Sequence, residues 1–181
     1  MNVNWTEVND LDAKLLARVD LTPLPDLIAG DEELAAAVEQ HDADLAELKD
    51  RFSQLTEQRR SMADDDAPGD IRRRIHGHHL IMATWDLLAS LHELLDVRRD
   101  LLRRMQARLA AEVSDLAQRR HERLKAAASG SDDDDPFADL SDQIAAREPA
   151  LRRLCAMRRR AGIDQRMVMA RREEAHSLHH R

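Results

Sequence analysis

The sequence is poor in the residues that build thick or cross-linked cores. Tyrosine is absent, and the only aromatic side chains in the 181 residues are Trp5, Phe52, Trp85 and Phe137. Cys155 is the only cysteine, so no disulfide can form within the chain. Glycine and proline number five each, while Ala, Leu and Arg, which lose little free energy on entering a helix, are abundant. This composition predicts an all-α protein with a thin core of two or three helices.

Long apolar runs are also missing. No stretch approaches the ~20 apolar residues that cross a bilayer, and the acidic residues 1–12 lack the apolar segment of a signal peptide. We therefore expect a cytoplasmic protein without a membrane partner. The net charge of −7 is unevenly distributed, because residues 1–70 carry 18 acidic and 6 basic side chains and residues 138–181 carry 6 and 10. We expect these two segments to attract each other within one bundle.

Three long helices are predicted at about residues 31–63, 71–127 and 137–178. They follow an N-terminal segment, residues 1–30, that holds a short helix at 6–19 and then Pro23 and Pro25. Asp31 is the expected N-cap of the first long helix. Its core positions are spaced alternately by four and three residues: Leu34, Val38, His41, Leu45, Leu48, Phe52, Leu55, Arg59 and Met62. This spacing is typical of a coiled coil, and Arg59 within it is interpreted as a register device or a side chain reaching for solvent.

The second long helix carries a broad apolar stripe. One column repeats every seven residues from Ile81 to Leu116, a second comprises Leu80, Leu87, Leu94 and Leu101, and a third comprises Thr84, Leu91, Arg98 and Met105. The third column is only half apolar. Together the columns are wide enough to contact two partner helices. Short connections favour antiparallel neighbours, so we predict an elongated antiparallel coiled-coil bundle over residues 31–181.

The last helix is less regular. Pro149 is expected to kink or restart it, and residues 163–181 show a weak pattern that predicts a helix only when they are packed or bound. Met157, Met167 and Met169 lie among arginines in this part of the chain. Because flexible methionines adapt to varied surfaces, we name them with Leu80, Leu87, Leu94 and Leu101 as candidate partner-binding residues. A loosely packed third helix explains the same pattern.

Histidines are the other unusual feature, with nine in the chain. If the two hairpin turns are centred near residues 67 and 132, then His41, His92 and His176 fall in one layer of the bundle. Such a layer could sense pH or bind a metal ion, because imidazole titrates near neutrality and ligates transition metals. The alternative is that each histidine lies at the edge of the seam and is hydrated.

Motifs of catalysis are missing from the sequence. It contains no glycine-rich phosphate loop, no Cys-x-x-Cys pair and no nucleophile motif, so no catalytic residue and no cofactor are predicted. The arginine clusters suggest phosphate contacts, but interleaved acids and the shortage of stacking aromatics disfavour a nucleic-acid partner.

Residues 86–105, DLLASLHELLDVRRDLLRRM, resemble the leucine-rich helix of FlgN-type flagellar export chaperones. The resemblance covers 20 of 181 residues and is one of composition. It implies a small cytoplasmic helical protein that holds an export substrate through an amphipathic helix. We therefore expect a non-catalytic interaction protein, an adaptor or export chaperone, with a protein partner. The alternatives are a structural coiled coil that self-associates, for example as a homodimer, and a histidine-based metal or pH sensor.

Overall fold

The computed structural model describes residues 3–25, 31–64, 71–127 and 138–179, and four helices account for nearly all of them. They are α1 (Trp5–Arg18), α2 (Glu32–Asp64), α3 (Ile71–Ala127) and α4 (Ala138–His179). The described residues contain no strand. The all-α prediction is therefore confirmed. Residues 26–30, which belong to the predicted N-terminal segment, lie outside the described residues.

Side-chain caps define where the first two helices begin. The Asn4 side chain accepts a hydrogen bond from the Glu7 amide (3.3 Å), and the Asp31 side chain accepts one from the Leu34 amide (3.0 Å). Each cap satisfies a backbone N–H group that has no partner in the first turn of a helix. Asp31 thus has the predicted N-cap role. The α1 helix ends at Arg18, and Val19 is already extended.

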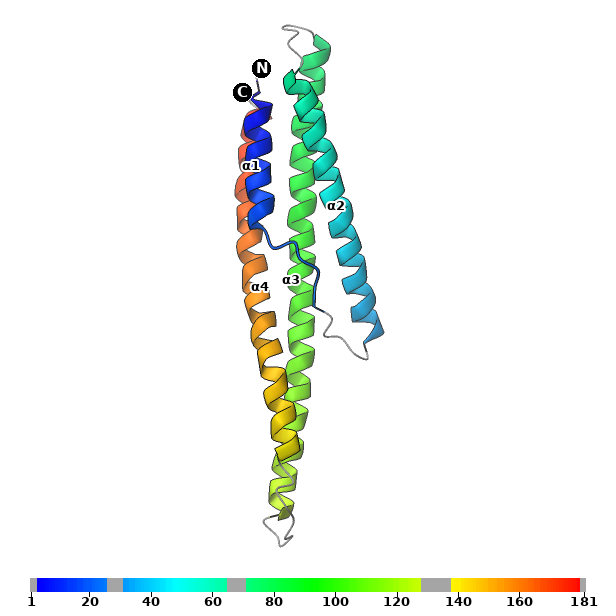
Figure 1. Ribbon diagram of the computed structural model, residues 1–181, viewed down its shortest axis with the longest axis vertical. Helices are drawn as coiled ribbons and strands as arrows, with labels where there is room; N and C mark the ends of the chain where they lie inside the picture. The colour runs from blue at the N-terminus through cyan, green and yellow to red at the C-terminus, as the bar shows by residue number, and fades with distance from the viewer. Residues whose placement is uncertain (1–2, 26–30, 65–70, 128–137, 180–181) are drawn as a thin grey trace.

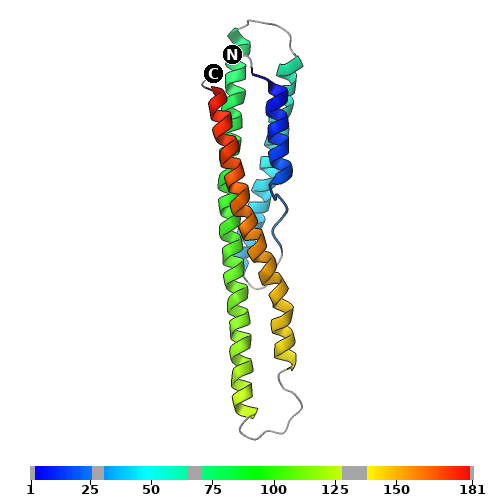
Figure 2. The ribbon, with the colours of Figure 1, turned by 90° about the vertical axis from the view of Figure 1, so that its left-hand side faces the viewer.

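The upper half of the molecule is a square four-helix bundle. Neighbouring pairs are α1–α2, α2–α3, α3–α4 and α4–α1, while the backbones of the diagonal pairs do not approach one another within the described residues. Consecutive helices run in opposite directions along the long axis (Figures 1 and 2). The broad stripe of α3 contacts both α2 and α4, as its width predicted.

The number of helices falls along the axis. The α1 helix covers only the upper part, and the chain then crosses α3 toward α2 (Figure 1). The α2 helix begins level with Arg108 of α3, whose Nη1 atom lies 2.9 Å from a carboxylate oxygen of Asp31. Among the described residues, only α3 and α4 continue beyond that level, linked by Arg147 and Glu112 at 3.4 Å. This two-helix arm extends about 28 Å along α3.

The core follows the predicted seam of α2. Eight of the nine predicted core positions are buried, and Val38 is half-buried. Two apolar clusters result. The upper one joins Trp5, Val8 and Leu15 of α1 to all three long helices, and the lower one centres on Leu102 and Leu154.

The fourth helix corrects one expectation. It continues without a break from Ala138 to His179 with Pro149 inside it, so the prediction that Pro149 restarts the helix is wrong. Its last part is helical because it is packed, since Val168, Arg171 and Ala175 are all buried. The two segments of opposite charge meet through α1 rather than through α2, because Asp12 of α1 pairs with Arg171.

Candidate functional site

One side chain from each helix meets in the middle of the four-helix part of the bundle. We call these four residues, Asp12, Arg59, Thr84 and Arg171, the upper polar cluster. All are buried, with exposed fractions of 1%, 0%, 2% and 5%. The sequence places Arg59 on the predicted α2 seam and Thr84 in the half-apolar column of α3, so both must face the bundle axis.

The carboxylate of Asp12 binds both guanidinium groups. Its Oδ2 atom accepts a hydrogen bond from Nη1 of Arg59 (2.7 Å), and its Oδ1 atom accepts one from Nε of Arg171 (2.8 Å). Nη2 of Arg59 donates to the Thr84 hydroxyl, which in turn donates to the Leu80 carbonyl (2.6 Å). The α1 helix is therefore held to α2 and α4 by charge-assisted hydrogen bonds, which are stronger than neutral ones.

The upper polar cluster contains more positive than negative charge. One carboxylate faces two guanidinium groups, and the next acid, Glu174, is 62% exposed and lies 3.6 Å from Nη1 of Arg171. Among the described residues, Nε of Arg59 and both terminal nitrogens of Arg171 have no hydrogen-bond partner. Burial lowers the pKa of Arg59, and the nearby Arg171 lowers it further, while Asp12 opposes both effects. The cluster is thus built to hold anionic groups.

Apolar contacts surround this polar centre. Trp5, Val8 and Leu15 line the inner face of α1 and join the same apolar cluster as Phe52 of α2 and Val168 of α4. Trp5 packs against the backbone of α3, because a Cβ atom added at Gly77 would lie 3.4 Å from the Trp5 ring. We call the surface of α2, α3 and α4 that α1 covers the α1 groove. The α1 helix that fills this groove has an acid, Asp12, at the centre of its apolar face.

The chain leaves the groove through residues 19–25, which we call the crossing segment. Side chains of the long helices form hydrogen bonds with its backbone. Asp164 accepts a hydrogen bond from the Asp20 amide (2.9 Å), and Arg98 donates to the Thr22 carbonyl (2.7 Å). Between these two contacts, Lys49 donates to the Leu21 carbonyl (2.9 Å). These contacts fix the point at which α1 ends and the chain passes to α2.

Charged groups gather under this segment. The guanidinium of Arg98 is 3.7 Å from the Asp20 carboxylate. Although burial raises the pKa of Asp20, hydrogen bonds from Thr22 and the charges of Arg98 and Arg160 lower it below its usual range. Burial lowers the pKa of Arg98 in turn, against the effects of Asp20, Asp42 and Asp164.

His41 belongs to this second group of charges. Its ring is 2% exposed, and Nδ1 lies 3.0 Å from a carboxylate oxygen of Asp42. Burial lowers the pKa of His41, and Arg98 lowers it further, while Asp42 and Asp44 raise it. Nε2 has no hydrogen-bond partner in the described part of the chain. His41 is therefore an uncharged imidazole in the core near neutral pH.

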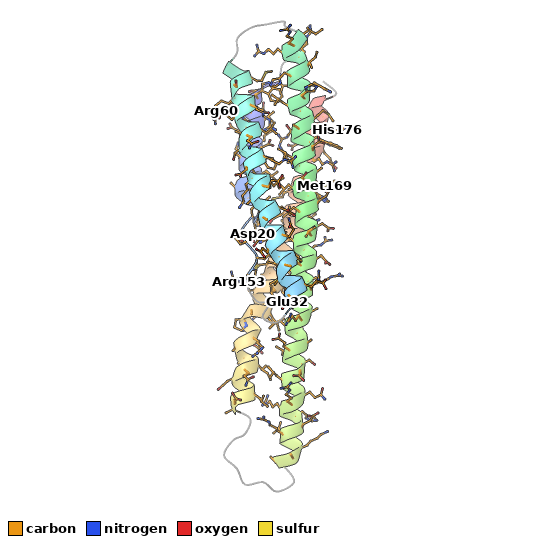
Figure 3. All side chains as sticks on the ribbon, turned by 90° about the vertical axis from the view of Figure 1, so that its right-hand side faces the viewer. Asp20, Glu32, Arg60, Arg153, Met169 and His176 are labelled. Carbon is orange, nitrogen blue, oxygen red and sulfur yellow. The ribbon has the colours of Figure 1, made fainter. Side chains whose placement is uncertain are left out.

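The three histidines predicted to share a layer do not do so. The ring of His176 lies 6.3 Å from Trp85, whereas His41 lies close to Arg98, about 20 Å further along α3. His92 is half-buried between these two levels. The predicted layer is wrong because α2 is shifted along α3 by about two turns from the assumed register, as the contact of Arg59 with Thr84 shows. Figure 3 shows His176 near the upper end and Asp20, a neighbour of Arg98, near mid-height.

Metal binding gains no support from this arrangement. The described residues contain no group of three or more His, Cys, Asp or Glu side chains placed to hold an ion. His176 and Arg172 instead flank Trp85, with the Arg172 guanidinium carbon 4.0 Å from the centre of the Trp85 ring. This contact is a cation–π interaction at the α3–α4 interface.

The predicted partner-binding leucines face inward. Leu80, Leu87 and Leu101 are 2%, 4% and 3% exposed, and Leu94 is half-buried against the upper apolar cluster. In the closed bundle the chain's own helices cover this column, so whether these leucines bind a partner stays a prediction. The three candidate methionines, Met157, Met167 and Met169, are half-buried on α4, and the first two pack against the apolar clusters.

Three residues of the two polar groups escaped prediction from the sequence. Asp12, Asp164 and Arg171 are acids or bases in helices rich in both, and their spacing carries no signal of burial. A weak signal existed for Asp12, because it lies between the apolar positions Val8 and Leu15 on one face of a short helix.

None of the described helices has the length and apolar character that a membrane crossing requires. No protein-family model, no curated protein and no solved structure matches this chain.

Proposed function

We propose that this protein is a non-catalytic, cytoplasmic helix-binding protein, an adaptor or an export-chaperone-like protein. Its binding site is the α1 groove, and its ligand is an amphipathic helix of a protein partner. The observation that carries the proposal is the docking of α1, a 14-residue helix that the groove binds through both apolar and charged contacts. Since a helix can be supplied by another chain as well as by the same chain, α1 marks the kind of ligand that fits.

The long helices support this function by their length and packing. We propose that α2, α3 and α4 supercoil as a regular antiparallel coiled coil, in which each helix orients the next over many turns. Such a frame keeps Arg59 on α2 and Arg171 on α4 on opposite sides of the groove. The crossing segment ends the groove, because its backbone is bound by Asp164 and Arg98.

A test is to weaken the docking of α1 within the full chain and supply the helix as a peptide. Trp5→Ala together with Leu15→Ala removes two buried anchors and leaves every charge in place. The matched control is Thr6→Ala with Lys14→Ala, two exposed positions of the same helix. The ligand is a fluorescein-labelled peptide of residues 3–22 with blocked ends, and fluorescence anisotropy reports its binding.

We expect the weakened chain to bind the peptide saturably, with a gain in helicity by circular dichroism, and the control chain to bind it far less. The reason is that α1 competes from within the chain at an effective concentration in the millimolar range. Absence of binding to a weakened chain that still unfolds cooperatively would refute the proposal. If the weakened chain is unfolded alone, the peptide must restore helical circular dichroism and a cooperative melting transition, and failure to do so also counts against the groove.

A second candidate function, self-association, is favoured by the arm that α3 and α4 form beyond α2. This arm has only two helices, and Leu124 on it is 44% exposed. Two-helix hairpins bury little apolar surface, so pairing of two arms would stabilise both. Light scattering over a range of concentrations tests this candidate, and a monomer at every concentration excludes it.

A further inference from the structure

The α1 helix satisfies its groove incompletely. It supplies one carboxylate, Asp12, to two buried guanidinium groups, and its second polar contact is the neutral amide of Asn9. Oδ1 of Asn9 accepts a hydrogen bond from Nη1 of Arg59 (3.2 Å), the same nitrogen that binds Asp12. Because Asn9 and Asp12 are three residues apart on a helix, both side chains point to the same side of the groove.

Resting on the proposed function, we propose that the partner helix carries two acids spaced by three residues at the centre of its apolar face. The first acid takes the position of Asn9 and the second that of Asp12. The pair neutralises both buried arginines, whereas α1 neutralises only one. The α1 helix is then an internal competitor that occupies the groove until a better-matched helix displaces it.

Charge complementarity favours this partner over a second copy of the chain. A second copy would bring another α1, which puts the same neutral Asn9 amide against Arg59 and the same single carboxylate between the two arginines. A helix with two acids replaces the neutral contact of Asn9 by a charge-assisted one. The gain in affinity is on the order of tenfold, given the usual difference between neutral and charged hydrogen bonds.

The position of Asn9 also limits this gain. Its Nδ2 atom donates to the Thr56 carbonyl at 3.3 Å, and a carboxylate at position 9 cannot make that contact. A carboxylate at position 9 must turn its second oxygen away from the Thr56 carbonyl, which keeps the hydrogen bond that α2 itself supplies. The advantage of the second acid therefore survives.

The experiment compares three peptides of residues 3–22 on the weakened chain, Trp5→Ala with Leu15→Ala, in which Arg59 and Arg171 are intact. One peptide has the native sequence, one carries Asn9→Asp, and one carries Asp12→Asn. We expect Asn9→Asp to bind about tenfold tighter than the native peptide. We expect Asp12→Asn to bind about 100-fold weaker, because it leaves two buried cations without an anion.

A further variant of the protein supplies the control for charge. Adding Arg171→Gln to the weakened chain should reduce the difference between the native and Asp12→Asn peptides, because only one of the two buried cations, Arg59, is left to lose its anion. Equal affinity of all three peptides for the weakened chain would overturn the inference while leaving the helix-binding function intact. Failure of all three to bind would overturn the function itself.

The oligomeric state of the unmodified chain tests the other candidate for the groove, which is α1 of a second copy. Sedimentation at several concentrations should give a monomer. A dimer that forms with rising concentration and is abolished by Asp12→Asn would assign the groove to α1 of a second copy and overturn the partner that we propose.

Discussion

Asp12→Asn in the intact chain should be among the most damaging single substitutions in this protein. The change is nearly isosteric, so it leaves the packing of α1 in place and removes only the charge that faces Arg59 and Arg171. All three side chains are at most 5% exposed. Breaking a buried ion pair by removing one partner costs about 3–5 kcal/mol, because the remaining charge stays buried without compensation.

That loss is a large part of the ~5–15 kcal/mol by which a folded domain exceeds its unfolded state. For a chain of this size it corresponds to a fall in melting temperature of about 10 °C. Urea unfolding followed by circular dichroism and by the fluorescence of Trp5 and Trp85 measures the free energy of unfolding. Coincidence of the two signals checks that the transition is two-state.

A triple variant, Asp12→Leu with Arg59→Met and Arg171→Met, removes the whole ionic cluster. It separates the cost of leaving buried arginines unpaired from the net contribution of the cluster to the free energy of unfolding. Replacing a whole buried ionic cluster by apolar side chains of similar volume is commonly neutral or stabilising by about 1–4 kcal/mol. We therefore expect the triple variant to be at least as stable as the wild type. A loss below about 1 kcal/mol in Asp12→Asn, or a triple variant as unstable as Asp12→Asn, would refute this account of the cluster.

Three further predictions concern other parts of the bundle. The free energy of unfolding should fall by up to about 1.4 kcal/mol per pH unit as the pH drops below 6.5, because unfolded His41 binds a proton there and folded His41, with its lowered pKa, does not. His41→Gln should remove this part of the pH dependence, and an unchanged profile of stability against pH would contradict the prediction. Gly77→Ala and Gly162→Ala should each raise the free energy of unfolding by about 0.5–1 kcal/mol in urea titrations, since Gly77 has room for a Cβ atom in ordinary contact and Gly162 has nothing within 4 Å. Arg172→Gln should cost about 0.5–1 kcal/mol and change the fluorescence of Trp85, which it covers; an unaltered emission spectrum would argue against that contact.

The helices were predictable because their signals are local. Spacing by four and three along α2 identified the side that is buried, and Asp31 marked where the helix begins. The observed bounds of the long helices differ from the expected ones by at most one residue. Pro149 misled because its penalty is local, whereas packing of α4 on α3 extends over many turns and overrides it.

The residues that face one another across two neighbouring helices were harder to predict. A heptad pattern fixes the face of a helix but not its position along the axis, so an error of about two turns placed His41 beside His92 instead of Arg98. The same pattern does not tell whether an apolar column is covered by its own chain or by another. The leucine column from Leu80 to Leu101 therefore looked like a partner surface, although it lies in the core of the bundle.

The polar members of the predicted seams account for the register that the leucines leave open. Thr84 and Arg98 belong to one column of α3, two heptads apart, and each meets a different polar residue of α2: Thr84 meets Arg59, and Arg98 meets His41. A slip of α2 by one heptad would keep leucine against leucine but would set Arg59 against Leu91, away from Asp12 and Thr84, its present partners. Since an unpaired buried guanidinium is far more costly than an exchanged leucine contact, only one register satisfies both levels. The residues that looked like interruptions of the coiled-coil pattern are therefore the ones that select a single alignment of the helices, and with it the α1 groove.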